Sequence, residues 1–167
     1  MSSPQTYLVV GGSRGIGKGL VEHLAATESN RVIATVRKPT SDFENFSNVS
    51  LLTLDQGSTS SVEAAAAEFK EPIDVLIVNA AIGNDEKVLT TSEERWQEYF
   101  EVNVVGFIRV VKSFLPALKK GRAKKIVLIS SGSGSLQVQL ERERGFKGPY
   151  SVSKVSEVDV PLQNACR

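Results

Sequence analysis

The chain has 167 residues, of which 41% are hydrophobic and 23% are charged, and its formal net charge is +1. This length allows one domain with a real core and is too short for two ordinary ones. The near-neutral charge gives no reason to expect nucleic acid or an acidic membrane surface as a partner. No apolar run approaches the roughly 18 residues of a membrane span, and we expect no signal peptide. Cys166 is the single cysteine, so an intrachain disulfide is excluded, and we expect a cytoplasmic protein.

Short apolar runs alternate with amphipathic stretches from the first strand onward. Runs that are apolar throughout predict strands buried on both faces, so the alternation indicates an α/β fold with a parallel sheet between layers of helices. Ser60 or Ser61 and Ser92 are candidate caps of two helices. The predicted strands are Tyr7–Val10, Arg31–Val36, Val49–Leu54, Ile73–Val78 and Lys125–Ile129, and the predicted helices are Ile16–Ala25, Ser60–Lys70 and Ser92 to about Lys120.

A glycine-rich turn separates the first predicted strand from the first predicted helix. Its glycines permit a tight turn and let the backbone approach a pyrophosphate at a helix N-terminus. Glycines also serve turns and caps for structural reasons alone, but the strand-turn-helix context is the one that a nucleotide-binding turn requires. The predicted cofactor contacts in this turn are Gly11, Ser13, Arg14 and Ile16.

The spacing Gly11-xxx-Gly15-x-Gly17 resembles the TGxxxGxG turn of the short-chain dehydrogenases/reductases. Val10 stands where that family usually has threonine, so we expect weaker local ordering of the turn rather than loss of binding. The resemblance implies a Rossmann-type doubly wound parallel sheet.

Two further segments extend the resemblance. Asp55 follows the third predicted strand, where the family's aspartate binds the adenine ring edge, and Gln56 stands beside it. The fourth strand ends in Val-Asn-Ala-Ala at 78–81, which is similar to the family's NNAG segment and contributes Asn79 and Ala80. A loop-capping role is the alternative for Asn79.

The second predicted strand indicates which nicotinamide cofactor binds. NAD-selective sites usually place an acid at the end of this strand, and here the strand ends in Arg37 and Lys38. Arg37 can pair with a 2′-phosphate, and Arg14 can approach the same phosphate. Both Arg37 and Lys38 could instead be solvated loop charges. Together with the missing acid, the two arginines favour NADP(H).

Tyr150 and Lys154 match the family's YxxxK motif. Residues four apart lie on one face of a helix, and a nearby ammonium favours the phenolate form of a tyrosine that works as an acid–base group. The family resemblance implies that Lys154 also holds the nicotinamide ribose. It also implies that Ser131 polarises the substrate carbonyl, with Ser133 as the alternative, and that Asn103 supports a proton-relay water.

The resemblance as a whole implies an NADPH-dependent ketoreductase that acts on a small carbonyl or alcohol substrate. Within the family the chain looks most like fungal ketoreductases of the norsolorinic acid reductase type, which suggests secondary metabolism. We expect Leu136–Arg144 to form a loop over the substrate pocket. An oligomer with itself or with related chains is also expected.

We interpret residues 1–167 as a single NADP-binding domain that is family-like over 6–155 and carries an atypical tail at 156–167. The family's strands six and seven are absent, so the fifth strand should form a sheet edge. A frameshifted or mis-spliced C-terminus is our interpretation of the tail. The alternative functions are therefore a catalytically inactive NADP-binding fragment and an interaction partner of a full-length relative.

Overall fold

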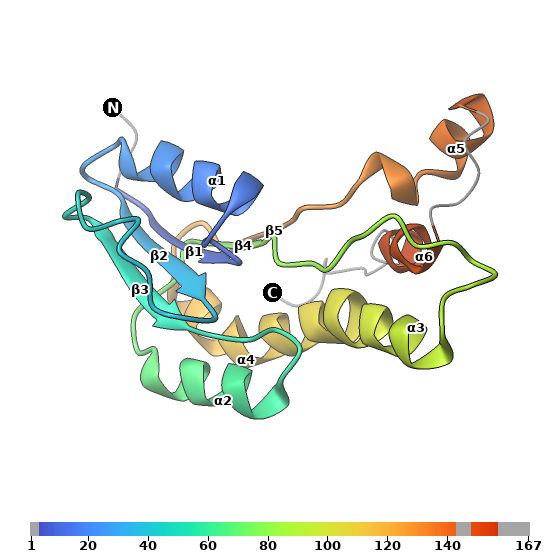
Figure 1. Cartoon of the computed structure of the whole chain (residues 1–167). Coiled ribbons are helices and arrows are strands. Elements are labelled where there is room, and N and C mark those ends of the chain that lie inside the picture. The colour runs from blue at the N-terminus through green and yellow to red at the C-terminus, as the bar shows by residue number, and fades with distance from the viewer. Residues whose placement is uncertain (1–3, 143–147, 157–167) are drawn as a thin grey trace.

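A five-stranded parallel sheet forms the centre of the computed structural model, which describes residues 4–142 and 148–156 (Figure 1). The strands lie in the order β3-β2-β1-β4-β5, and every neighbouring pair is parallel. The chain therefore moves outward from β1 to one edge and returns through β4 to the other, as a doubly wound fold requires. The strands are β1 (Thr6–Val10), β2 (Arg31–Val36), β3 (Val49–Thr53), β4 (Val75–Val78) and β5 (Lys125–Leu128).

Helices cover both faces of the sheet, as the sequence predicts. Figure 1 shows α1 (Gly15–Ala25) on one face and α2 (Thr59–Glu68) and α4 (Gly106–Lys120) on the other. No helix in the described part of the chain is both long and apolar enough to cross a membrane. The remaining helical segments are α3 (Glu93–Tyr99), the π-helical η1 (Phe100–Val105), the 3-10 turn η2 (Gly132–Gly134), α5 (Leu136–Arg142) and α6 (Gly148–Ser156).

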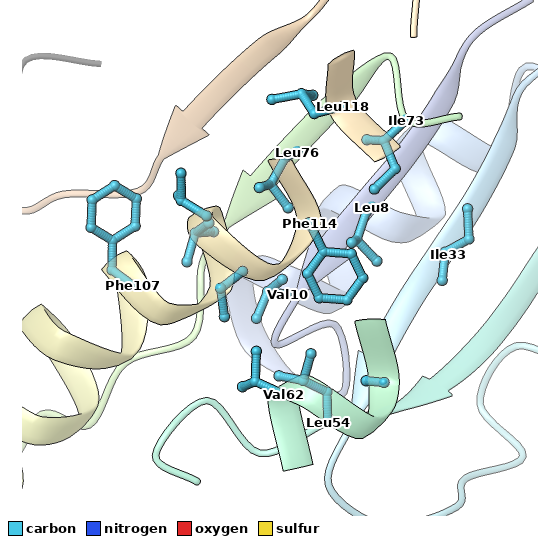
Figure 2. Close-up of a cluster of buried hydrophobic side chains, with 14 residues drawn as sticks. Leu8, Val10, Ile33, Leu54, Val62, Ile73, Leu76, Phe107, Phe114 and Leu118 are labelled. Atoms are coloured by element: carbon cyan, nitrogen blue, oxygen red, sulfur yellow. The ribbon is translucent and has the colours of Figure 1, made fainter. Parts of the chain in front are cut away.

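Alternate side chains of the central strand, β1, pack into two separate hydrophobic cores, one on each face of the sheet. Leu8 and Val10 belong to the core beneath α2 and α4, whereas Val9 belongs to the core beneath α1, and all three are fully buried. This arrangement explains why Leu8, Val9 and Val10 are all apolar, since both faces of this part of β1 are buried. Figure 2 shows the larger core, whose labelled residues are Leu8, Val10, Ile33, Leu54, Val62, Ile73, Leu76, Phe107, Phe114 and Leu118.

The two outer strands are less buried than the three inner ones. β3 and β5 form the edges of the sheet, and their residues are exposed or only partly buried. Within the described residues no strand pairs with the outer side of β5, which confirms the prediction of an edge there. The atypical tail at 157–167 lies outside the described residues.

Three details differ from the sequence-based expectations. The cap of α2 is Ser58, whose side chain accepts from the Ser61 amide, so the prediction of Ser60 or Ser61 is wrong. The cap at Ser92 is confirmed, but the long helix that follows contains the π-helical η1, where the Gly106 amide donates to the carbonyl five residues back. The predicted loop at Leu136–Arg144 is also wrong, because residues 136–142 form α5; residues 143 and 144 lie outside the described residues.

Asp74 ties together the end of the sheet opposite the glycine-rich turn. This residue is 6% exposed, and its carboxylate accepts hydrogen bonds from the Thr6, Arg122 and Ala123 amides at 2.9, 2.7 and 3.4 Å. Burial alone would raise the pKa of Asp74, but the amide hydrogen bonds outweigh it and hold that pKa below its usual value.

We predict that Asp74→Asn destabilises the protein at neutral pH by about 2 kcal/mol, because the amide NH2 of the buried side chain must face at least one of these N–H donors. A carboxyl whose pKa is depressed in the folded state contributes stability above its unfolded pKa of about 3.9, and the contribution is lost as the pH falls through the folded value. The difference in urea stability between parent and variant should therefore shrink below about pH 4. Asp42→Asn is the control at an exposed ion pair with Lys18, and it should have a much smaller effect at neutral pH. A parent–variant difference for Asp74 that stays constant with pH would contradict the assignment.

Candidate functional site

The carboxyl ends of the inner strands enclose a cavity, which we call the glycine-turn cavity. Most of the predicted cofactor residues line it: Gly11, Ser13, Arg14, Arg37, Asp55, Gln56, Asn79 and Ala80. Ile16 is not among the lining residues and is 67% exposed on α1. The other lining residues are Val10, Thr35, Leu54, Ala81, Ile82 and Val102.

Thr35 holds the glycine turn in place from β2. The Gly11 amide donates to Thr35 Oγ1 and the Gly12 amide to the Thr35 carbonyl, both at 2.9 Å. Thr35 is 1% exposed. The sequence did not predict its role, because a single threonine in an otherwise apolar strand does not indicate which backbone groups its hydroxyl will contact. The weaker ordering that we expected from Val10 is therefore opposed by a hydroxyl from the neighbouring strand.

The turn itself uses glycine where a side chain has no room. Gly11 has a φ of +83°, which favours glycine, and a Cβ at Gly17 would lie 2.0 Å from the Gly11 carbonyl oxygen. The α1 N-terminus has no side-chain cap, so its first amides remain available to an anion. Asn79 Nδ2 donates to the Gly11 carbonyl at 3.0 Å, so Asn79 supports the turn.

Two arginines line the glycine-turn cavity, Arg14 from the glycine-rich turn and Arg37 from the end of β2. Neither arginine forms an ion pair with another residue in the described ranges. Asp55 is the acid on the cavity wall, and it follows β3 rather than β2.

Gln56 is a buried polar residue between the cavity and η1. Its Nε2 donates to the Ala80 carbonyl at 3.0 Å and to the Val102 carbonyl at 2.8 Å, and the residue is 3% exposed. Its Oε1 is buried and has no hydrogen-bond partner in the described structure. A buried acceptor without a donor costs about 1–3 kcal/mol, so this atom marks a place where a donor from water or a ligand would be stabilising.

A second cavity, which we call the Tyr150 cavity, lies beside the first. The two cavities share Ala81 and Ile82 from the loop after β4, which therefore forms a wall between them. A Cβ at Gly83 would lie 3.0 Å from the Tyr150 ring, so the backbone of this loop packs directly against the ring. The lining residues are Ala81, Ile82, Gly83, Asn84, Asp85, Ser133 and Tyr150.

The structure brings Tyr150 and Lys154 together on α6. Lys154 is 2% exposed, and its Nζ lies 5.9 Å from the centre of the Tyr150 ring. The same ammonium donates to the Ile129 carbonyl at 3.1 Å, directly after β5. The four-residue spacing therefore places the Lys154 ammonium near the Tyr150 ring.

The two candidate serines occupy different places. Ser131 Oγ accepts from the Ser133 amide at 3.1 Å and caps η2. Ser133, the alternative, lines the Tyr150 cavity, whereas Ser131 does not line it. The order of residues along the chain could not distinguish the two, because the tight turn of η2 decides which one faces the cavity.

Asn103 lies in η1 and is 1% exposed. Its Oδ1 accepts from the Ile82 amide at 2.9 Å, and its Nδ2 donates to the Ile82 carbonyl at 3.0 Å and to Ser153 Oγ at 2.9 Å. The side chain therefore contacts both the wall between the cavities and the helix that carries Tyr150.

A charged cluster on α3 holds the same loop and was missed by sequence reasoning. The Asn84 amide donates to Tyr99 Oη at 2.9 Å, and Arg95 donates to Glu86 at 2.7 Å while its guanidinium lies 4.8 Å above the Tyr99 ring. Burial, followed by the hydrogen bond with Glu86, raises the pKa of Tyr99. Burial opposes ionisation of Glu86, but the Arg95 guanidinium outweighs it and lowers the pKa of that carboxyl. The neutral phenol and the ion pair thus fix one wall of the Tyr150 cavity.

We predict that Thr35→Val destabilises the protein by about 1 kcal/mol, because the Gly11 amide loses its acceptor while the side-chain volume is conserved. Thr35→Ser is the matched control, since it keeps the hydroxyl. Urea unfolding of the three proteins gives the comparison. Equal stability of the valine variant and the parent would show that the hydroxyl does not hold the turn.

Comparison with known proteins agrees with this geometry. The family model for short chain dehydrogenases matches residues 5–156. An uncharacterized oxidoreductase of Schizosaccharomyces pombe is 37% identical over 140 residues, which cover 78% of this chain and 55% of that protein. The short chain dehydrogenase gsfK of Penicillium aethiopicum is 37% identical over 149 residues, which cover 80% and 59%. The chain thus spans little more than half the length of these relatives.

Among solved structures, the NADPH-bound carbonyl reductase from chicken fatty liver superimposes with a TM-score of 0.81 at 27% identity, over 91% of this chain and 66% of that one. The parallel sheet, the glycine turn and the Tyr150–Lys154 pair are therefore accompanied by a family match over most of the chain. On this evidence the chain belongs to the short-chain dehydrogenase/reductase family of oxidoreductases.

Proposed function

We propose that this chain carries the cofactor-binding and carbonyl-reducing residues of an NADPH-dependent ketoreductase. The observation that carries the proposal is the wall of Ala81 and Ile82 shared by the glycine-turn cavity and the Tyr150 cavity. A cofactor bound in the first cavity and a small carbonyl compound bound in the second would then be neighbours. Proximity of this kind is what a hydride transfer requires.

The residues of the glycine-turn cavity fit NADPH. Gly11 and the uncapped N-terminus of α1 suit a pyrophosphate, and Arg14 and Arg37 suit a 2′-phosphate. The orphaned acceptor of Gln56 and the carboxylate of Asp55 offer partners for donors at the adenine end. When bound, NADPH supplies the hydride that reduces the carbonyl carbon. The NADPH-bound carbonyl reductase of similar fold supports this choice of cofactor.

Tyr150 is the proposed proton donor. Its phenol lines the cavity and would give a proton to the carbonyl oxygen as that oxygen gains negative charge. The Lys154 ammonium, 5.9 Å from the ring centre, would stabilise the charge that remains on Tyr150. Alcohol oxidation would use the same groups with the proton moving back to Tyr150.

Two assignments from sequence stay predictions. A serine hydroxyl would orient the carbonyl, and the lining of the cavity favours Ser133, whereas family resemblance favours Ser131. A proton-relay water at Asn103 also stays a prediction; both Nδ2 protons of the side chain are engaged, by the Ile82 carbonyl and by Ser153, and Oδ1 accepts one hydrogen bond, from the Ile82 amide. A cytoplasmic location and a role in secondary metabolism also stay predictions.

A second candidate function is NADP binding without turnover. The chain spans little more than half the length of the relatives that it matches, and the outer side of β5 is unpaired within the described residues. In this alternative the glycine-turn cavity would bind the cofactor, and the β5 edge, which is unpaired within the described residues, would suit pairing with a strand of a related chain.

We predict that Arg37→Ala raises the Kd for NADPH about 10-fold to 100-fold and leaves the Kd for NADH unchanged, because a charge-assisted hydrogen bond contributes about 1.5–3 kcal/mol. Lys38→Ala is the neighbouring control and should change neither. Titration followed by nicotinamide fluorescence measures both constants. Equal affinity of the parent for NADPH and NADH would overturn the cofactor assignment.

We predict that Tyr150→Phe lowers kcat for ketone reduction at least 100-fold, by loss of the proton donor, and leaves NADPH affinity within twofold. NADPH consumption with a panel of ketones measures turnover. In the same assay Ser133→Ala and Ser131→Ala show which serine orients the carbonyl. A parent that binds NADPH and reduces no ketone would favour the non-catalytic alternative.

A further inference from the structure

We infer that Ser153 is a positioning residue that sets the orientation of Tyr150 and Lys154, and that Asn103 orients Ser153 from outside the helix. The inference rests on the proposed function of the Tyr150–Lys154 pair. Ser153 is one of the residues that the YxxxK motif leaves unspecified, so the motif by itself assigns it no role.

Ser153 stands in a directed chain of hydrogen bonds. It is fully buried, its Oγ donates to the Tyr150 carbonyl at 2.8 Å, and the same oxygen accepts from Asn103 Nδ2 at 2.9 Å. An amide nitrogen only donates, so the hydroxyl proton is directed to the Tyr150 carbonyl. The chain therefore runs in one direction, from Asn103 through Ser153 to the backbone of Tyr150.

The other end of this chain is the wall between the two cavities. Asn103 uses its Oδ1 and its second Nδ2 proton on the amide and carbonyl of Ile82. Ile82 lines both the glycine-turn cavity and the Tyr150 cavity. One buried amide thus connects the boundary of the cofactor cavity to the helix that carries the proposed proton donor.

Two glycines bring neighbouring backbone close to α6. A Cβ at Gly134 would lie 2.7 Å from the Lys154 carbonyl, and a Cβ at Gly148 would lie 2.1 Å from the Glu86 carbonyl. These are close approaches of one backbone to another. Rotation about the helix axis decides where Tyr150 and Lys154 point, and the hydrogen bond from Asn103 to Ser153 is a side-chain contact that opposes such rotation.

Ser156 shows what an ordinary serine on this helix does. Its Oγ donates to the Val152 carbonyl at 3.2 Å, and it is exposed at the surface. Each of the two serines donates its hydroxyl to a backbone carbonyl of α6. They differ because Ser153 is buried and accepts from Asn103, whereas Ser156 is exposed. Ser156→Ala is therefore a matched control for Ser153→Ala.

The first test separates catalysis from stability. In the full chain, Ser153→Ala should lower kcat at least 10-fold and change the KM for NADPH by a smaller factor, because the residues that line the glycine-turn cavity are unaltered and only the predicted contact of Lys154 with the nicotinamide ribose is disturbed. Ser156→Ala should leave both constants unchanged. A Ser153→Ala protein that unfolds at a lower temperature but keeps the parent's kcat when folded would overturn the inference, since its role would then be structural only.

The second test does not depend on turnover, so it distinguishes failure of this inference from failure of the proposed function. The full chain is labelled with fluorotyrosine, and the Tyr150 resonance is assigned by its absence in Tyr150→Phe. Ser153→Ala should shift or broaden that 19F resonance, and Ser156→Ala should leave it at the parent position. An unchanged Tyr150 resonance in Ser153→Ala overturns the inference even if the parent reduces no ketone.

Discussion

The carbonyl of Val10, at the end of the central strand, is the acceptor on which both cavities depend. The Asn79 and Ala80 amides both donate to it, at 3.0 and 2.9 Å, so the turn after β1 and the loop after β4 are joined where the two strands end. The Asn79 side chain repeats the link by donating to the Gly11 carbonyl. Residues of these two segments line both cavities: Gly11, Ser13, Arg14, Asn79 and Ala80 line the glycine-turn cavity, Gly83, Asn84 and Asp85 line the Tyr150 cavity, and Ala81 and Ile82 line both.

Two buried polar residues outside the apolar cores, Gln56 and Asn103, connect more distant elements to the loop after β4 by hydrogen bonds. Gln56 joins the loop after β3 to η1, and Asn103 joins η1 to the loop after β4 and to α6. A buried polar side chain without partners would be costly, so the hydrogen bonds that these two amides make favour the arrangement in which the segments meet. The π-helical turn of η1 lies where these contacts converge, which connects an irregular helix to the chemistry of the site.

The two halves of the site differ in how they are supported. The glycine-turn cavity lies at the carboxyl ends of the inner strands, where the strand residues are buried on both faces. The Tyr150 cavity is lined by residues of the loop after β4, of η2 and of α6 rather than by strands. The helix α6 is held by contacts with η1, with η2 and with the loop before α3. The glycine-turn cavity therefore has more of its support from buried strands, whereas the position of Tyr150 depends on contacts and hydrogen bonds to α6.

The sequence by itself determined the features that depend on near neighbours in the chain. The apolar runs predicted all five strands, the glycine spacing predicted the turn, and a four-residue interval placed Lys154 near Tyr150. The tertiary structure decided which side chains meet across long intervals: the Gly11–Thr35 bond spans 24 residues and the Asn103–Ser153 bond spans 50. It also decided that Ser133 rather than Ser131 lines the Tyr150 cavity. Periodicity records the face of an element on which a residue lies, whereas a hydrogen bond between distant segments depends on how the whole chain packs.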